Sequence, residues 1–147
     1  MSTHVARLTF VILGVSAIGL ATSCASSTSP NAPSSQTNTV TFSTQIQQQI
    51  LNPACVACHT DEGRTPSSGL NLKTGVSIAN LVNIASVGKA GAVRVIPGNP
   101  SGSYLIQKLE GAPDIVGLRM PRNGPPYLTT EQVALIRQWI QNGAPNN

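Results

Sequence analysis

Two cysteines and a histidine lie within five residues of one another, in the order Cys55-Val56-Ala57-Cys58-His59. This spacing has three chemical interpretations: a redox-active dithiol, part of a zinc site, or a covalent anchor for a porphyrin. The interpretations make different demands on the rest of the chain. A redox dithiol needs a strand followed by a helix, and a structural zinc needs four protein ligands. The surrounding sequence must therefore decide between them.

The first 23 residues are predicted to be a signal peptide. Residues 1–7 carry one Arg and no acid, and the 13 residues from Leu8 to Leu20 are almost wholly apolar. As a helix this stretch would rise only about 20 Å, which is shorter than the roughly 30 Å hydrocarbon core of a bilayer. A cleaved export signal therefore fits better than a membrane span.

Cys24 gives the export signal a sharper interpretation. It directly follows Ala21-Thr22-Ser23, and small residues before a cysteine at this place resemble the lipobox of bacterial lipoproteins. The resemblance implies that Cys24 is acylated and that the protein is a periplasmic or outer-membrane-anchored lipoprotein. It departs from the usual pattern at Ala21, where lipoboxes usually have Leu. The alternative is an ordinary signal peptidase cut after Ser23 or Ala25, which would release a soluble exported form.

Residues 24–40 are predicted to be a flexible tether. They are rich in Ser, Thr, Asn and Pro and contain no aromatic or charged residue, so they cannot bury enough apolar surface to offset the entropy of ordering. The predicted domain, residues 41–147, is poor in aromatic residues, with Phe42, Tyr104, Tyr127 and Trp139 only. A bound apolar cofactor would compensate for this thin supply of large side chains.

The pattern of apolar residues predicts an all-α domain of short helices and long loops. Residues 42–51 place Ile46, Ile50 and Leu51 on one face, with Thr44 and Gln47 in capping-box spacing, and Pro53 is expected to end this helix. No alternation long enough for a sheet and no internal repeat is visible.

Three further helices are expected. A weaker pattern covers residues 76–82, and another helix follows Pro100-Ser101-Gly102-Ser103 and ends at Gly111. The last has the strongest signal, because Thr129-Thr130-Glu131-Gln132 forms a capping box and Asn142-Gly143 follows the final turn. Between these residues the apolar positions fall on one half of the helix: Val133, Leu135, Ile136, Trp139 and Ile140.

Elimination favours the porphyrin. A helical chain does not offer the βαβ setting of a redox dithiol, and after signal removal His59, Cys55 and Cys58 supply only three zinc ligands. A disulfide between Cys55 and Cys58 would close a very small loop and give His59 no role. Thioether attachment through both cysteines, with His59 as the proximal iron ligand, uses every residue of the motif.

The chain resembles the class I monohaem c-type cytochromes of exported bacterial proteins. The resemblance covers about Thr41 to Ala144, and it implies a small cytochrome c-like domain around one covalent haem c. Its strongest element is Cys55-Val56-Ala57-Cys58-His59 after a first helix, followed by a Met-Pro pair some sixty residues later. Weaker blocks are G-L-N-L (69–72), V-I-P-G-N-P (95–100), S-Y-L-I-Q-K-L (103–109), R-M-P (119–121) and the closing W-I-Q-N-G-A.

Met120 is the expected sixth iron ligand. Once Met1 and His4 leave with the signal, Met120 is the sole thioether and no second histidine remains, and Pro121 biases it to an extended backbone. Thioether ligation favours ferrous iron, and two filled axial positions leave no open site for a substrate. We therefore expect a single-electron carrier and not an enzyme. The alternative for Met120 itself is a gap-filling core residue.

Two other functions remain open. The same domain would serve as the subunit through which electrons enter a larger dehydrogenase or peroxidase complex, or as a haem-based ligand sensor if the sixth position is labile. Nucleic acid is not expected as a partner, because the net charge of +4 is mild and no run of basic residues occurs. The expected partners are redox proteins with an acidic docking face, together with a membrane through the lipid on Cys24.

Three further residues have expected positions. Arg119 and Arg122 flank Met120, and each either lies at the haem edge, where it can pair with a propionate, or is simply solvated. By resemblance, Trp139 packs the last helix against the first near the haem.

Overall fold

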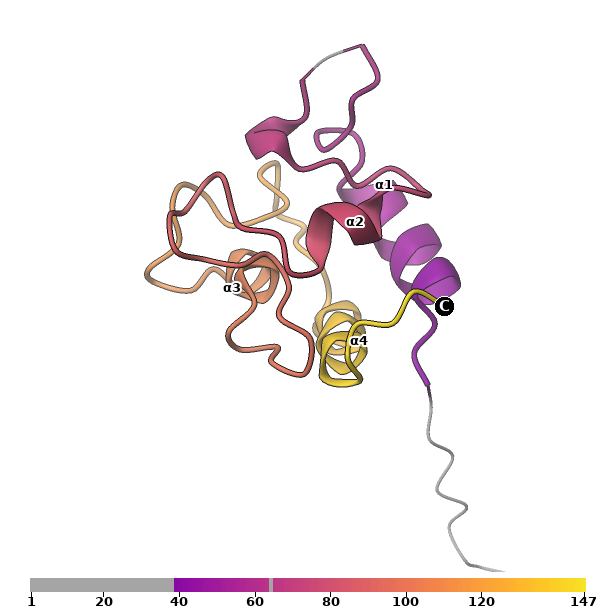
Figure 1. Cartoon of the computed structure of the whole chain (residues 1–147). Coiled ribbons are helices and arrows are strands. Elements are labelled where there is room, and N and C mark those ends of the chain that lie inside the picture. The colour runs from indigo at the N-terminus through magenta and orange to yellow at the C-terminus, as the bar shows by residue number, and fades with distance from the viewer. Residues whose placement is uncertain (1–38, 64) are drawn as a thin grey trace, which may run out of the picture. The chain divides into compact units, whose positions relative to one another are not determined.

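The computed structural model of the chain describes residues 39–63 and 65–147 (Figure 1). The predicted signal peptide, Cys24 and most of the predicted tether lie outside these residues. The described part is helix-rich and contains no strand or sheet, which agrees with the expected all-α class. Its elements are η1 (Phe42–Leu51), α1 (Asn52–Ala54), η2 (Ser67–Gly69), α2 (Ser77–Leu81), α3 (Tyr104–Glu110) and α4 (Thr130–Gln141).

The first helix begins at the expected residue, but two expectations about its ends are wrong. Its N-cap is Thr41, whose backbone N–H donates to the Gln45 side chain, so Thr44 lies inside the helix. The Gln47 side chain is buried and donates to the carbonyl of Leu72, which removes it from any capping role. Pro53 does not end the helical path, because it lies in the first turn of α1, where a missing N–H is tolerated.

Helix η1 has π-type geometry and leads directly into the cysteine motif. At its end the backbone N–H of Asn52 donates to Gln47, five residues earlier, and that of Val56 donates to Leu51. The N–H of Cys55 also donates to the Leu51 carbonyl at 2.9 Å. The cysteines therefore continue the turn of a helix that is itself buried along one face through Phe42, Ile46, Ile50 and Leu51.

Helices α2 and α3 confirm the expected middle elements. α2 is one residue shorter at each end than the pattern predicted. α3 begins after Ser103, whose buried hydroxyl accepts from the Ile96 N–H at 2.8 Å and donates to the Asn99 carbonyl at 2.8 Å. It ends at Gly111 in the left-handed conformation (φ 73°), as predicted for a C-cap glycine.

Helix α4 carries the predicted capping box. The Thr129 side chain accepts from the Gln132 N–H at 3.3 Å, and the Gln132 side chain accepts from the Thr129 N–H at 2.9 Å. Trp139 is fully buried and contacts Phe42 of η1 with ring centroids 4.9 Å apart, so the last helix packs against the first. α4 also packs against α3, and these three helices enclose most of the core.

Two long loops complete the described chain. Residues 82–103 connect α2 to α3 and contain two isolated bridges, Val82 with Val95 and Ala85 with Val93. Residues 112–128, which we call the Met loop, connect α3 to α4 and include Met120. Val40, at the end of the predicted tether, is buried in the core. Among the described residues, no helix has both the length and the apolar character needed to cross a membrane.

Candidate functional site

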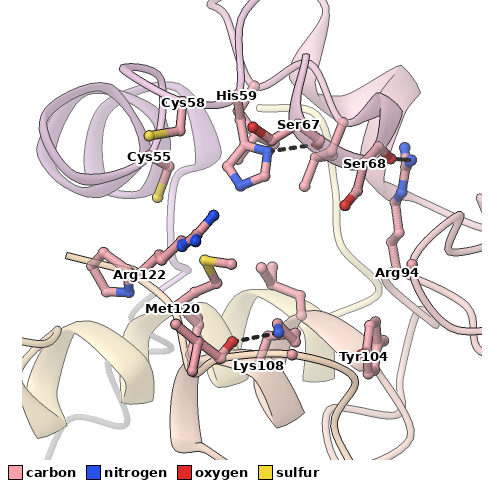
Figure 2. Close-up of a pocket in the computed structure, with 18 of the residues that line it drawn as sticks. Cys55, Cys58, His59, Ser67, Ser68, Arg94, Tyr104, Lys108, Met120 and Arg122 are labelled. Atoms are coloured by element: carbon pink, nitrogen blue, oxygen red, sulfur yellow. Dashed lines mark hydrogen bonds between the residues drawn. The ribbon is translucent and has the colours of Figure 1, made fainter. Parts of the chain in front are cut away.

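A cavity of about 550 Å³ opens between the cysteine motif, helix α3 and the Met loop (Figure 2). Its volume lies within the range of small-molecule and cofactor sites. Apolar side chains form much of its wall, among them Leu70, Leu72, Leu81, Leu105 and Leu109. We call it the central pocket.

The cysteine motif forms one wall of the central pocket. The backbone N–H groups of Cys58 and His59 both donate to the Cys55 carbonyl, at 3.1 and 3.0 Å, which fixes the three side chains relative to one another. The N–H of Leu72 donates to the His59 carbonyl at 2.8 Å and closes the intervening loop. All three predicted motif residues line the pocket.

A backbone carbonyl orients the His59 ring. Its Nδ1 lies 3.1 Å from the carbonyl oxygen of Ser67, which can only accept, so Nδ1 carries the proton and Nε2 is the basic nitrogen of the neutral ring. Figure 2 shows the ring directed from Ser67 into the pocket. A hydrogen bond of this kind is how proteins set the tautomer and direction of a metal-binding histidine.

The cysteines lack the character of a redox dithiol. Both are free thiols in the structure, Cys55 partly buried and Cys58 exposed. Burial, with a smaller contribution from the charge of Cys58, raises the pKa of the Cys55 thiol to about 11. Dithiols that exchange disulfides need a lowered pKa, because the thiolate is the nucleophile. A redox dithiol is therefore disfavoured.

A zinc site is also disfavoured. In the two described segments, no group of three or more His, Cys, Asp or Glu side chains converges as metal ligands do. Cys55, Cys58 and His59 instead lie along one wall, where they face a volume far larger than a single ion. That arrangement suits attachment of an extended flat molecule.

Met120 lies on the opposite wall. Its backbone N–H donates to the carbonyl of Lys108 in α3 at 2.9 Å, and its side chain is partly buried against the core. Figure 2 shows the thioether and the His59 ring directed into the pocket from opposite sides. The structure therefore brings together His59 and Met120, the two residues predicted as axial ligands.

Arg94 is a pocket residue that the sequence interpretation missed. It is only 7% exposed, and its guanidinium donates to the carbonyls of Ser68, Gly69 and Asn80 at 2.8 to 3.1 Å. Desolvation lowers its pKa, and it forms no ion pair with any described residue. A buried cation without an anionic partner is costly, so the site favours an anionic group on a ligand.

The charged residues that line the central pocket are all basic. Among the described residues that line it, Arg94, Lys108 and Arg122 are cationic and none is acidic. In Figure 2 Arg94 lies at the end of the pocket away from the two cysteines. A ligand joined to the cysteines at one end and carrying carboxylates at the other would match this distribution of charge.

The two arginines beside Met120 have separate positions. Arg122 is exposed and lines the pocket, whereas Arg119 turns away and donates from Nε to the Leu109 carbonyl at 2.7 Å. The Arg119 guanidinium also lies over the Tyr127 ring, 4.1 Å from its centroid. Trp139 packs the first and last helices together as expected, but it is not among the residues that line the pocket.

Arg94 and Lys108 carried weak signals in the sequence. Each is a single charged residue within an apolar run, Val93-Arg94-Val95-Ile96 and Leu105-Ile106-Gln107-Lys108-Leu109. A charge in such a place indicates a buried or pocket role only when the fold is known.

Comparison with protein-family models, curated proteins and solved structures gave no significant match.

Proposed function

We propose that the protein is an exported monohaem cytochrome c that carries single electrons with His59 and Met120 as axial ligands of the haem iron. The observation that carries the proposal is the opposition of these two side chains across an apolar pocket whose near wall also holds Cys55 and Cys58. The fold would be of the cytochrome c type, a finer assignment than the all-α class.

The residues of the central pocket fit haem c in three respects. The thiols of Cys55 and Cys58 would each add across a vinyl group, with sulfur bonding to one vinyl carbon and hydrogen to the other. The Nε2 of His59 is the unprotonated nitrogen of the neutral ring, because Nδ1 carries the proton, and it would be the atom that binds iron. Arg94, at the far end, offers a buried positive charge to the haem carboxylates.

Electron transfer accounts for the site better than catalysis. Haem supplies a one-electron Fe(III)/Fe(II) couple, and thioether ligation favours the ferrous state. Met120 and its loop would occupy the position at which a peroxidase or a gas sensor binds its ligand. The chain's own role would be to exclude water, to hold both ligands and to set the charge around the pocket.

The proposed partners are inferred from the charges at the pocket and from the predicted signal peptide with Cys24. Arg122 and Lys108 at the pocket suit a redox partner with an acidic face, since such charges steer encounter between proteins. Lipid on Cys24 would tether the domain to a membrane in the periplasm or at the outer membrane. The same domain would also serve as the electron-accepting subunit of a dehydrogenase or peroxidase complex, which copurification of a catalytic chain would reveal.

An optical spectrum of the exported protein in both redox states tests the proposal. We expect the bands of a c-type haem, full reducibility, and a weak near-infrared band of the ferric form that arises from sulfur-to-iron charge transfer. Rapid binding of carbon monoxide to the ferrous form would favour a sensor instead. A protein exported with the haem-attachment machinery yet free of haem would overturn the proposal.

A further inference from the structure

The Met loop lacks secondary structure of its own to hold Met120 in place. It contains no helix or strand, and the valine and leucine before Met120 line the central pocket but are not buried, with Val116 57% and Leu118 59% exposed. Neither the core nor a hydrogen-bonded ladder therefore fixes residues 116–118. Its position must depend on individual bonds to neighbouring elements.

Lys108 supplies two of those bonds from α3. Its ammonium donates to the carbonyl of Val116 at 2.8 Å and to that of Leu118 at 2.5 Å, which spans the three residues that lead to the ligand. The Lys108 carbonyl in turn accepts from the N–H of Met120 at 2.9 Å. One residue thus holds the loop through both its side chain and its backbone.

The Lys108 ammonium is directed to backbone carbonyls of the Met loop and not to a carboxylate of the described residues. Lys108 forms no ion pair with any described residue, and its side chain is partly buried at the pocket wall. Hydrogen bonds from a charged donor are about twice as strong as those between neutral groups. Two carbonyls that converge on one ammonium therefore form a strong local attachment.

Arg119, the residue directly before Met120, attaches the Met loop to α3 a second time. It donates to the Leu109 carbonyl, and its aliphatic stem crosses the end of α3 at Gly111, where a β-carbon would come within 3.0 Å of it. The attachments to the two halves of this segment thus involve consecutive residues of α3, the Lys108 side chain and the Leu109 carbonyl. The C-terminal turn of that helix is therefore the platform on which the Met120 segment rests.

We propose that Lys108 is a positioning residue for Met120, which keeps the thioether on the iron by clamping the Val116 and Leu118 carbonyls to α3. This inference rests on the proposed function, because it concerns the bond between Met120 and iron. It assigns to Lys108 no contact with the iron and no part in electron transfer itself.

The test compares Lys108→Met and Lys108→Arg with Lys73→Met in the haem-loaded protein. Lys108→Met keeps the apolar stem and removes the donor, while Lys108→Arg keeps charge and donors. Lys73→Met is the matched control, because it removes one positive charge from a residue that pairs with Asp61 and does not touch the Met loop. The readouts are the near-infrared band of the ferric form, the affinity of ferric iron for imidazole, which competes with Met120, and the midpoint potential.

For Lys108→Met we expect a weakened band and imidazole affinity increased at least about tenfold, because a larger population has Met120 displaced. Lys108→Arg should retain most of the band, and Lys73→Met should match the parent in the band and in imidazole affinity. If Lys108→Met does not accumulate as folded holoprotein, Lys108→Gln gives the same comparison, since its shorter amide cannot span both carbonyls.

The outcomes separate this inference from the proposed function. Parent-like band and imidazole affinity in Lys108→Met would overturn the clamp and leave the cytochrome assignment intact. A shift of midpoint potential alone, equal in Lys108→Met and Lys73→Met, would show that Lys108 acts only as a distant charge and would also overturn it. Absence of the band from the parent protein would instead overturn the His59 and Met120 ligation on which the inference rests.

Discussion

The Nδ1 of His59 lies 3.1 Å from the carbonyl oxygen of Ser67, and this hydrogen bond directs the opposite ring nitrogen into the central pocket. The two residues are eight positions apart, and the chain beyond Ser67 returns to the motif through the bond from the Leu72 N–H to the His59 carbonyl. The wall of the central pocket formed by the cysteine motif is therefore ordered by contacts with the backbone within one short stretch of chain.

Covalent attachment through Cys55 and Cys58 is the first prediction. Haem should stay with the polypeptide through acid-acetone extraction and denaturing electrophoresis, because thioether bonds survive both. Replacing both cysteines by Ala should release the haem and leave an underfilled pocket, with a loss of stability of several kcal/mol, on the order of that caused by large cavities. Haem that extracts freely from the parent protein would exclude thioether attachment.

Replacement of Met120 should lower the midpoint potential, since a thioether favours ferrous iron. Met120→Ala should also abolish the near-infrared band and admit water or added ligands. Met120→His should keep the iron six-coordinate and still lower the potential, which separates the electronic effect of sulfur from simple occupancy. Potentiometry with optical detection measures both. A Met120→Ala protein with the parent potential would assign Met120 to packing alone.

Lipidation of Cys24 would appear in the mass of the mature N-terminus. We expect acyl chains on Cys24 and partition of the protein with membranes, and Cys24→Ala should abolish both. A mature chain that starts unmodified at Cys24, or after Ala25, would place the protein in the soluble exported pool. The haem assignment does not depend on this result.

Loss of the α4 capping box should measurably weaken the fold. Thr129→Ala removes the side-chain acceptor of the Gln132 N–H, and helix N-caps of this type contribute about 1 kcal/mol. Thr130→Ala is the matched control, because it changes the next residue and leaves the cap in place. Denaturant unfolding of the two variants should show the loss for Thr129→Ala only; equal midpoints would mean that the cap adds nothing to stability.

The ion pair between Glu110 and Arg137 predicts part of the acid sensitivity of the domain. Two hydrogen bonds of 2.8 Å from Arg137 lower the pKa of the Glu110 carboxyl. The folded-state pKa lies below the unfolded one, so this stabilisation is present above the unfolded value and is lost as the pH falls through the folded value.

Glu110→Gln should therefore reduce the difference in unfolding free energy between about pH 6 and about pH 3. Arg137→Gln should reduce it equally, and the double variant should add nothing further, because both changes remove the same interaction. The effect should shrink in high salt, since the pair is partly exposed. Additive effects of the two substitutions would mean that the Glu110 and Arg137 side chains contribute to stability independently of each other.

Local signals in the sequence predicted the helices well. The capping box at Thr129 and the glycine at Gly111 act through contacts within one or two turns, and both are found where they were expected. Errors occurred where a side chain is used at a distance: Gln47 matched a capping pattern, but its amide is buried against residues 25 and more positions away. Local patterns do not carry that information.

Some residues of the candidate site could be predicted from local sequence patterns and others could not. Cys55, Cys58, His59 and Met120 could be named from composition and spacing, and all four line one pocket. Ser67, Arg94 and Lys108 could not, because Ser67 acts through its backbone and the other two through carbonyls of distant loops. Contacts of this kind depend on the path of loops, which hydrophobic periodicity does not describe.

The two walls of the central pocket differ in how they depend on the rest of the fold. His59 belongs to the same short segment as the cysteines, whereas Met120 reaches it only after about 60 further residues have folded back, at a cost in loop-closure entropy. If haem is bound as proposed, partial unfolding should therefore detach Met120 first, while His59 stays beside the haem. Loss of the Met120 ligand alone would then indicate a locally opened molecule, whereas loss of both ligands would indicate a globally unfolded one.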